Sequence, residues 1–276
     1  MFELPEYTTI ARQMNQTLVG KIILQGTLGN TPHKFVWYNR TPAEFEQLTD
    51  GKVIGHASVR GRWLLLDLNP GLRLVLGECG GRILFHPSAG SVPEKYHLLI
   101  GFTDGSFLTV MTTMWGAMEL YHAGEELQRQ YIQGMRMTPV DAGFTLEYFQ
   151  SLLDELMTGQ KRSIKSFLTQ DQIIPGLGNS IAQDIMFNAR LHPRHLLGDL
   201  EKSQREGLFH AIVSTVEEVI QNGGRSDESD LFGMPGGYHR KMDKDAVCTP
   251  CQVCGTPVEQ FQYLGGRCYF CPSCQV

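Results

Sequence analysis

The sequence predicts an α+β protein with more than one domain, and three patterns along the chain carry this prediction. Short apolar stretches separated by glycine and proline turns fill the chain up to about residue 122, which is typical of antiparallel strands. Apolar residues at helical spacing replace them between about residues 145 and 221. Near the C-terminus, six of the seven cysteines form two clusters. The length of 276 residues also exceeds the usual size of one hydrophobic core.

The N-terminal part is expected to form a helix followed by an antiparallel β-sandwich or barrel. Apolar residues recur at helical spacing over residues 3–19, with Pro5 in the first turn. Turn signals such as Asn69-Pro70-Gly71 then separate short strand patterns, which predict a sandwich or barrel over residues 20–122. The strand patterns are Arg62–Leu68, Leu72–Leu76, Arg82–His86, Tyr96–Phe102 and Ser106–Thr112.

A helical domain is expected next. Helical periodicity marks the segments 145–157, 161–169, 179–190 and 200–221. The stretch 222–246 is rich in glycine, aspartate and serine, which predicts a mobile loop. The expected organisation is an N-terminal domain (1–122), a linker (123–140), a helical domain (141–222), a mobile loop (223–246) and a cysteine module (247–276).

The cysteine module is predicted to be a zinc ribbon with one structural Zn²⁺. A C-x2-C turn supplies two thiolates from one tight loop, and two such turns complete a tetrahedral site. Gly255 and Pro272 suit the sharp turns of Cys251/Cys254 and Cys271/Cys274, which favours these four as ligands. Cys248 and Cys268 could each replace one partner. Disulfides or free buried thiols are the alternative, but nothing marks the chain as secreted.

Composition and the N-terminal sequence narrow the class of protein. With 42% hydrophobic and 19% charged residues, the chain is typical of a globular protein. No apolar run is long enough to span a bilayer, and MFELPEYTT lacks the basic start of a signal peptide. We therefore expect no membrane partner and a cytoplasmic protein. The net charge of −5 argues mildly against a nucleic-acid partner.

A glycine turn runs directly into a helix at Gly178-Asn179, within the segment IIPGLGNSIAQDIMFNARLHP. Such a turn leaves backbone N–H groups free at the positive end of the helix dipole, where a phosphate oxygen binds well. The alternative is a plain helical hairpin with a Gly-Asn cap.

Together these motifs carry a family resemblance. They are E-L-P-E at the N-terminus, L-G-x-x-G at Leu76–Gly80, Ile164-Lys165-x-x-Leu168, then PGLGN…LHP and C-x2-C-G-T-P…C-x2-C-Q. In this order they resemble the formamidopyrimidine-DNA glycosylase and endonuclease VIII family over essentially the whole chain. The resemblance implies a β-sandwich, a helix-two-turn-helix domain with a zinc ribbon, and damaged or abasic double-stranded DNA as partner. It also implies a monomer that works at the nucleoid, flips out a damaged base, cuts its glycosidic bond and nicks the abasic strand.

Several site residues carry over from the resemblance. Glu3 matches the acid that manages protons at the sugar, and Glu6 matches the second N-terminal acid. Arg62 stands where the family has a lysine that binds phosphate, which keeps the charge but changes its geometry. Lys165 and Asn179 match residues that hold the phosphates around the lesion.

The N-terminus departs from the family pattern. The family has a proline at residue 2, whose amine attacks the sugar C1′ and forms an imine. Here residue 2 is Phe2, before which initiator methionine is normally retained. The free amine of Met1 would then lie about 3.5 Å further along an extended chain. With an ordinary pKa near 8, an α-amine is still able to act as a nucleophile.

Other DNA-facing positions also differ. Glu78 replaces the methionine that fills the gap left by the flipped base, and phosphates would repel this acid. Met114 and Trp115 replace the arginine and phenylalanine that wedge the opposite strand. Trp115 is either an apolar wedge or part of the sandwich core. Arg267 lies one residue after the expected place of the ribbon arginine, and the loop over the flipped base matches 223–238.

The leading hypothesis is a base-excision repair enzyme, a DNA glycosylase with abasic-site lyase activity that uses Glu3 and an N-terminal amine. The alternative is a catalytically impaired protein that binds DNA lesions or abasic sites, which Phe2 and Glu78 favour. A third is a glycosylase in which an acid activates water. A basic groove is expected on the acidic body, formed by Lys161, Arg162, Lys165, Arg190, His192, Arg194, His195, Arg60 and Arg62.

Overall fold

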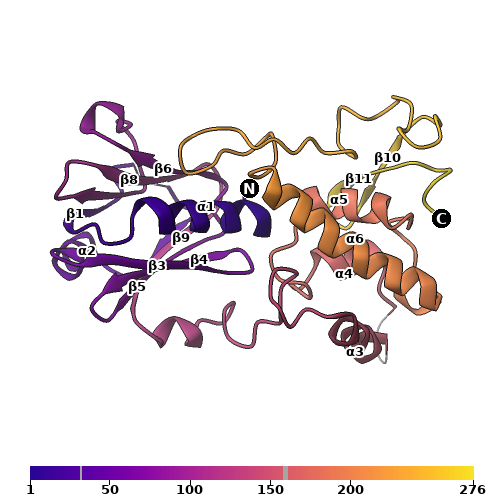
Figure 1. Ribbon diagram of the computed structural model, residues 1–276, viewed down its shortest axis with the longest axis horizontal. Helices are drawn as coiled ribbons and strands as arrows, with labels where there is room; N and C mark the ends of the chain where they lie inside the picture. The colour runs from indigo at the N-terminus through magenta and orange to yellow at the C-terminus, as the bar shows by residue number, and fades with distance from the viewer. Residues whose placement is uncertain (32, 158–160) are drawn as a thin grey trace. The chain divides into compact units, whose positions relative to one another are not determined.

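The computed structural model describes residues 1–31, 33–157 and 161–276, which form two compact units (Figure 1). Met1–Met135 and Asn222–Gly237 make the first unit; Arg136–Gln221 and Tyr238–Val276 make the second. Residue 32 and residues 158–160 fall within the predicted domains 1–122 and 141–222 but outside the described residues. None of the described helices combines the length and apolar character needed to cross a membrane.

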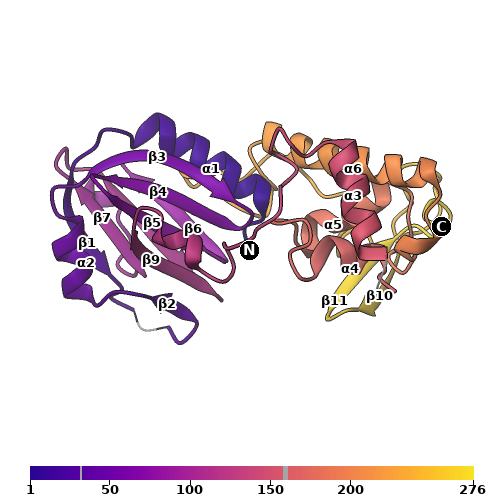
Figure 2. The same cartoon turned by 90° about the horizontal axis from the view of Figure 1, so that it is seen from below.

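The first unit contains the expected β-sandwich (Figure 2). One sheet has the strand order β1-β7-β8-β6 and the other has the order β2-β9-β5-β4-β3. All pairs are antiparallel except β2 with β9. The strands are β1 (Ile23–Leu28), β2 (Val36–Tyr38), β3 (Val53–Arg60), β4 (Trp63–Asn69), β5 (Leu72–Gly77), β6 (Gly81–His86), β7 (Leu98–Phe102), β8 (Phe107–Thr112) and β9 (Gly116–His122).

All five strand patterns named from the sequence are strands here, β4 to β8. The pattern did not single out β1, β2, β3 or β9. In β4 the alternation is clear, because Leu64, Leu66 and Leu68 enter the core between the sheets. Trp63 and Leu65 point to the other face, where they form a smaller cluster with Ile132. This outer face of the five-stranded sheet therefore carries apolar side chains as well.

Two helices pack on the sandwich. The helix α1 (Leu4–Thr17), expected over residues 3–19, packs on β3 and β4 and buries Tyr7, Ile10 and Met14 in the core. The helix α2 (Pro42–Thr49), which the sequence did not reveal, packs on β1 and is capped by Thr41. Two 3₁₀ turns, Ala89–Ser91 and Glu125–Gln128, complete the unit.

The second unit contains the four expected helices and a terminal hairpin. The helices are α3 (Leu146–Met157), α4 (Ile164–Thr169), α5 (Asn179–Asn188) and α6 (Lys202–Gln221), with a 3₁₀ turn at Leu197–Asp199. The hairpin pairs β10 (Glu259–Tyr263) with β11 (Gly266–Phe270), and β11 packs on α5.

Buried Asp184 fastens the segment that leads to this hairpin. Its carboxylate accepts hydrogen bonds from the Tyr238 hydroxyl (2.8 Å) and from the backbone N–H groups of Lys241 and Met242. Burial raises the pKa of Asp184, while these donors oppose the rise. The chain after Tyr238 is thereby held against α5.

Gly77 offers a test of the packing on the outer face. A Cβ atom at this position would lie 1.8 Å from Cε3 of Trp63, so the indole ring lies directly on the glycine. We expect Gly77→Ala to lower the free energy of unfolding by about 1–3 kcal/mol, since the ring must leave its place. Denaturant unfolding measures the change.

The matched control is Gly207→Ala, on an exposed part of α6 where an added Cβ meets nothing within 4 Å. It should stabilise the protein by up to about 1 kcal/mol, because alanine favours the helix. Equal changes in the free energy of unfolding for the two substitutions would contradict the close packing of Trp63 on Gly77.

Candidate functional site

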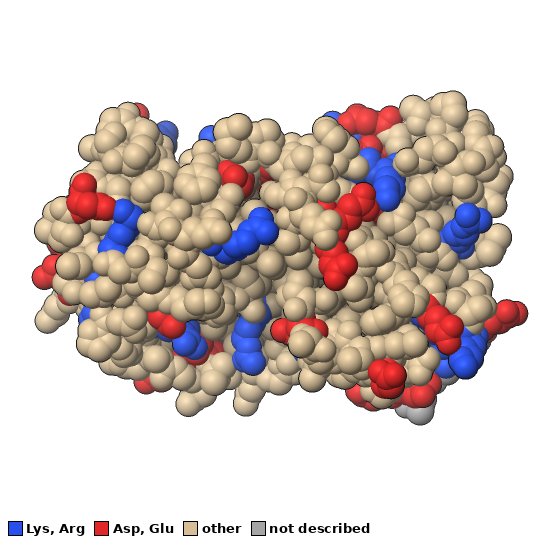
Figure 3. All heavy atoms as spheres, in the orientation of Figure 1, with Lys and Arg blue, Asp and Glu red and all other residues tan. Residues whose placement is uncertain are grey.

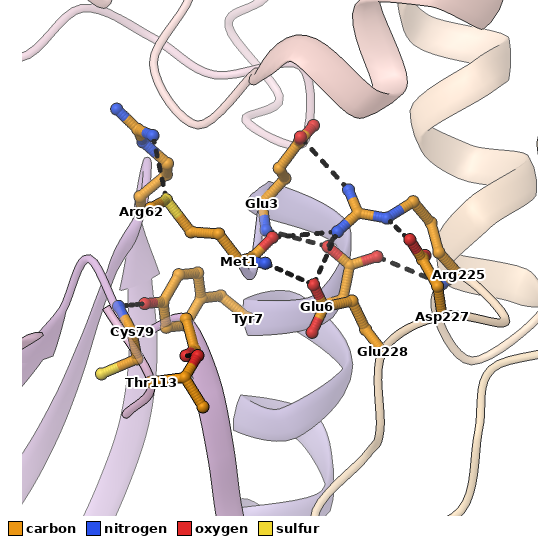
Figure 4. A network of polar contacts seen from close by, with 11 residues as sticks. Met1, Glu3, Glu6, Tyr7, Arg62, Cys79, Thr113, Arg225, Asp227 and Glu228 are labelled. Atoms are coloured by element: carbon orange, nitrogen blue, oxygen red, sulfur yellow. Dashed lines mark hydrogen bonds and ion pairs between the residues drawn. The ribbon is translucent and has the colours of Figure 1, made fainter. Parts of the chain in front are cut away.

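Arg225 lies at the centre of a polar cluster at the start of α1 (Figure 4). Its side chain is 1% exposed. Ion-pair distances of 3.3–3.4 Å join the guanidinium to four carboxylates, those of Glu3, Glu6, Asp227 and Glu228. We call these five residues the Arg225 cluster. It joins the N-terminus to the segment Asn222–Gly237, far apart in the sequence.

Burial and the neighbouring charges shift the pKa values of two members of the cluster, Glu6 and Arg225. Burial raises the pKa of Glu6; the neighbouring Glu3 adds to the rise, and Arg225 opposes it. Burial by itself lowers the pKa of Arg225, but the surrounding carboxylates outweigh this effect and raise it. Arg225 therefore stays charged, and Glu6 holds a proton more readily than an exposed glutamate does.

The amine of Met1 belongs to the same site. It bonds to Oε1 of Glu228 at 2.5 Å, and the Met1 carbonyl oxygen accepts a hydrogen bond from Nη2 of Arg225 at 2.9 Å. Phe2, by contrast, is fully buried, and its backbone N–H donates to the Cys79 carbonyl at 3.1 Å. The nitrogen at residue 2 is thus an amide held in the core, whereas the Met1 amine lies among carboxylates.

Arg62 and Glu78 lie beside Met1 and pair with each other. Nη2 of Arg62 is 3.4 Å from Oε1 of Glu78, and Nη1 is 3.7 Å from the Met1 sulfur. Glu78 follows β5 with a φ of 52°, in the left-handed region. An acid at this position therefore offsets the charge of the arginine expected to bind phosphate.

Met114 and Trp115 lie in the loop between β8 and β9, and both are exposed. The Trp115 ring stacks on Trp37 with centroids 5.3 Å apart. Trp115 therefore lies outside the sandwich core, and the apolar wedge is the role that remains a prediction.

In the second unit, Lys165 and Asn179 hold the turn of the β10–β11 hairpin. Lys165 is 1% exposed, and its Nζ donates to the carbonyl oxygens of Tyr263 (2.7 Å) and Gly266 (3.4 Å). Asn179, the first residue of α5, donates to the Arg267 carbonyl at 3.4 Å. The Arg267 side chain itself is exposed.

The sulfur atoms of Cys251, Cys254, Cys271 and Cys274 all lie within 4.8 Å of one another. The Sγ atoms of Cys251 and Cys274 are 3.9 Å apart, and those of Cys254 and Cys271 are 3.4 Å apart. Metal–sulfur bonds of about 2.3 Å in a tetrahedron place sulfurs about 3.8 Å apart, so this donor set fits a metal ion. Cys248 and Cys268 are not among the four.

Sequence reasoning missed Arg225 and Glu228, the two partners that complete the N-terminal site. Both fall in the stretch GGRSDESD, where glycine and acids predicted a mobile loop. One basic residue among acids was the available signal, but no spacing rule links it to the N-terminus. On the face drawn in Figure 3, acidic and basic side chains are interspersed, and Arg162 of the expected basic groove pairs with Asp171 at 2.9 Å.

Comparison with known proteins gives consistent matches along the chain. The model of the formamidopyrimidine-DNA glycosylase N-terminal domain matches residues 1–114, and that of the formamidopyrimidine-DNA glycosylase H2TH domain matches residues 137–230. The formamidopyrimidine-DNA glycosylase of Cytobacillus firmus is 30% identical over 291 residues, covering all of both chains. That of Bacillus licheniformis is 29% identical over 282 residues, covering 100% of this chain and 99% of the relative.

Solved structures share the fold. A complex between Lactococcus lactis Fpg and DNA containing an abasic site has a TM-score of 0.86 at 23% identity, with 99% of each chain covered. MutM (Fpg) from Thermus thermophilus has a TM-score of 0.81 at 23% identity, with coverage of 99% of this chain and 98% of that chain.

The Arg225 cluster predicts a pH-dependent loss of stability. Arg225→Met would leave Glu3 and Glu6 buried without their counter-ion, which is expected to cost about 3–5 kcal/mol at neutral pH. The cost should shrink as the pH falls, because protonated carboxyls need no cation. Denaturant unfolding at neutral and mildly acidic pH measures both effects.

Lys202→Met is the control. Lys202 is 85% exposed, and its ion pair with Glu206, at 3.9 Å, lies on the surface, where such pairs contribute little to stability. It should change stability little at either pH. A loss in Arg225→Met that does not depend on pH would exclude the unpaired carboxylates as its cause.

Proposed function

The chain belongs to the formamidopyrimidine-DNA glycosylase family, and we propose that it is a base-excision repair enzyme that removes a damaged base and nicks the abasic strand. The match to the Cytobacillus firmus relative covers both chains completely. Relatives of the same fold were solved with DNA containing an abasic site or Fapy-dG, which supports damaged DNA as the partner. The enzyme would work as a monomer in the cytoplasm, at the nucleoid.

One observation carries the catalytic part of the proposal. The Met1 amine bonds to the Glu228 carboxylate, and the Met1 carbonyl shares Arg225 with Glu3 and Glu6. The Glu228 carboxylate is therefore in place to accept the proton that the amine must lose before its nitrogen can attack. Phe2 offers no such group, because its nitrogen is an amide that donates to Cys79.

The reaction then follows from these groups. A base must leave the stack before its sugar can be reached. The Met1 nitrogen attacks C1′, the bond between C1′ and the base breaks, and the departing base takes up a proton. The amine then loses a proton, the C1′–O4′ bond of the sugar breaks, O4′ takes up a proton, and the nitrogen lone pair forms the imine between Met1 and C1′. Glu3 transfers protons at the sugar, and subsequent loss of a C2′ proton expels the 3′ phosphate and nicks the strand.

For the second unit we propose a role in phosphate binding. Arg267 is exposed on β11, while Lys165, which is buried, and Asn179, which is exposed, hold the turn that carries it. Lys165 would thus act on DNA chiefly through the hairpin. We propose that Trp115 and Met114, which are exposed apolar side chains, contact the DNA strands.

A structural Zn²⁺ is proposed for the four-thiol site. Four cysteine sulfurs within 4.8 Å of one another suit zinc, and closed Cys₄ sites are structural. When bound, the ion would fix the two C-x2-C turns that support the hairpin.

Binding without cleavage is the second candidate function, and two observations favour it. The nitrogen of residue 2 is held in the core, and Glu78 pairs with Arg62. A protein with these features would hold damaged DNA but react slowly or not at all.

Borohydride trapping separates the two functions. The full-length untagged protein, incubated with abasic-site duplex and borohydride, is expected to give a covalent adduct whose peptide map places the sugar on Met1. Glu3→Gln should slow adduct formation by about 10²–10⁴-fold, the usual effect of a proton-transfer group. Glu46→Gln, on an exposed position of α2, serves as the control and should react like the parent.

Mass spectrometry of the N-terminal peptide must first show whether the purified protein retains Met1. Tight, salt-sensitive binding of the abasic-site duplex without any covalent adduct would show that the protein binds damaged DNA and does not cleave it.

Metal analysis tests the ribbon. The purified protein should contain one zinc per chain, and a chelator should lower its melting temperature, because metal binding contributes to folding. Cys254→Ala is expected to lose the zinc, whereas Cys248→Ala, which removes a thiol outside the cluster, should keep it. Loss of zinc from both variants would refute this ligand set.

A further inference from the structure

An aromatic cavity of about 760 Å³ opens on the outer face of the five-stranded sheet, entirely within the first unit. Its size falls in the range of small-molecule sites, about 300–1,000 Å³. All three tryptophans of the chain line it, together with Tyr131 and Arg129. Met1 touches the cavity, but Glu3 and Arg225 are not among its lining residues.

The register of the sheet explains the hollow. Trp37 pairs with Ala117, Ala117 with Gly77, and Gly77 with Trp63, so these four lie at one level across β2, β9, β5 and β4. Directly paired residues point to the same face of a sheet. Two small residues therefore separate two indoles, and Trp63 covers Gly77. The space beside the rings lies over Ala117.

Stacked and exposed aromatic faces line this space. Trp37 stacks on Trp115 with an interplanar angle of 10°, and Trp63 stacks on Tyr131 with an angle of 12°. Trp37, Trp115 and Tyr131 are 45%, 40% and 64% exposed. Proteins that hold single-stranded nucleic acid use such surfaces, because every base presents a flat π face.

The charged side chains around the cavity indicate which kind of ligand ring it can bind. The guanidinium carbon of Arg129 lies 4.0 Å from the Trp63 ring centre, and Nε of Arg129 donates to Glu119, so a cation already occupies the face of Trp63. The carboxylates of Glu78 and Glu119 also line the cavity, paired with Arg62 and Arg129, and their remaining lone pairs can accept hydrogen bonds from amino groups. These features favour a neutral planar ring with N–H donors.

We propose that this cavity binds an unpaired DNA base that carries an exocyclic amino group, with its sugar and phosphate outside. The site is additional to the Arg225 cluster. The proposal rests on the proposed function only in taking the base from a DNA strand.

Tryptophan fluorescence of the full-length protein provides the test. Undamaged single-stranded oligodeoxycytidylate should quench the emission and bind more tightly than oligothymidylate, whose base lacks the amino group. Binding of a labelled oligodeoxycytidylate, followed by anisotropy, should weaken about tenfold in Trp37→Leu and in Trp115→Leu. Glu78→Gln should narrow the preference for cytosine over thymine.

Leu24→Ala is the matched control, because Leu24 is 64% exposed on β1 in the other sheet. It should bind like the parent, and thermal melting checks that each variant is folded. Unchanged binding in both tryptophan variants, equal affinity for the two oligonucleotides, or stronger quenching by tetramethylammonium would each overturn the proposal. Since the DNA is undamaged and single-stranded, such a result leaves the borohydride test of the enzyme unaffected.

Discussion

Burial of one cation, Arg225, among four carboxylates is the constraint on which the first unit depends. A guanidinium out of water is tolerated only where opposite charges replace its hydration. Glu3 and Glu6 from the start of α1, and Asp227 and Glu228 from the later segment, meet this need together. The segment Asn222–Gly237 is thereby fixed to the sandwich, and Leu231 enters the sandwich core.

The same interaction determines what the N-terminus can do. Glu6 accepts hydrogen bonds from the backbone N–H groups of Glu3 (2.9 Å) and Arg225 (3.1 Å), so it organises the first turn of α1 as well as the ion pairs. With Phe2 anchored in the core, the chain delivers Met1 to the edge of the cluster. Structure and proposed chemistry therefore share the same carboxylates, and a substitution there affects both.

In the second unit, hydrogen bonds to backbone carbonyls hold the terminal hairpin in place. Backbone carbonyls at the turn of the β10–β11 hairpin receive the buried ammonium of Lys165, and Gln183 of α5 donates to the Arg267 carbonyl at 3.1 Å. The four cysteine sulfurs gather at the other end of this hairpin. A small hairpin has little core of its own, so these polar contacts and the proposed metal determine its position.

The sequence by itself determined the elements whose signals are local. Alternation in β4, the helical period of α1 and α3 to α6, and the spacing of Cys251, Cys254, Cys271 and Cys274 are properties of short stretches. The ordered motifs also indicated the family and the carboxylates Glu3 and Glu6. Only the tertiary structure decided that Arg225 lies against them, that Lys165 is buried, and that Trp37 and Trp63 face each other across Ala117 and Gly77. These contacts join residues distant in the chain, and their free energy depends on burial and charge, which no local pattern encodes.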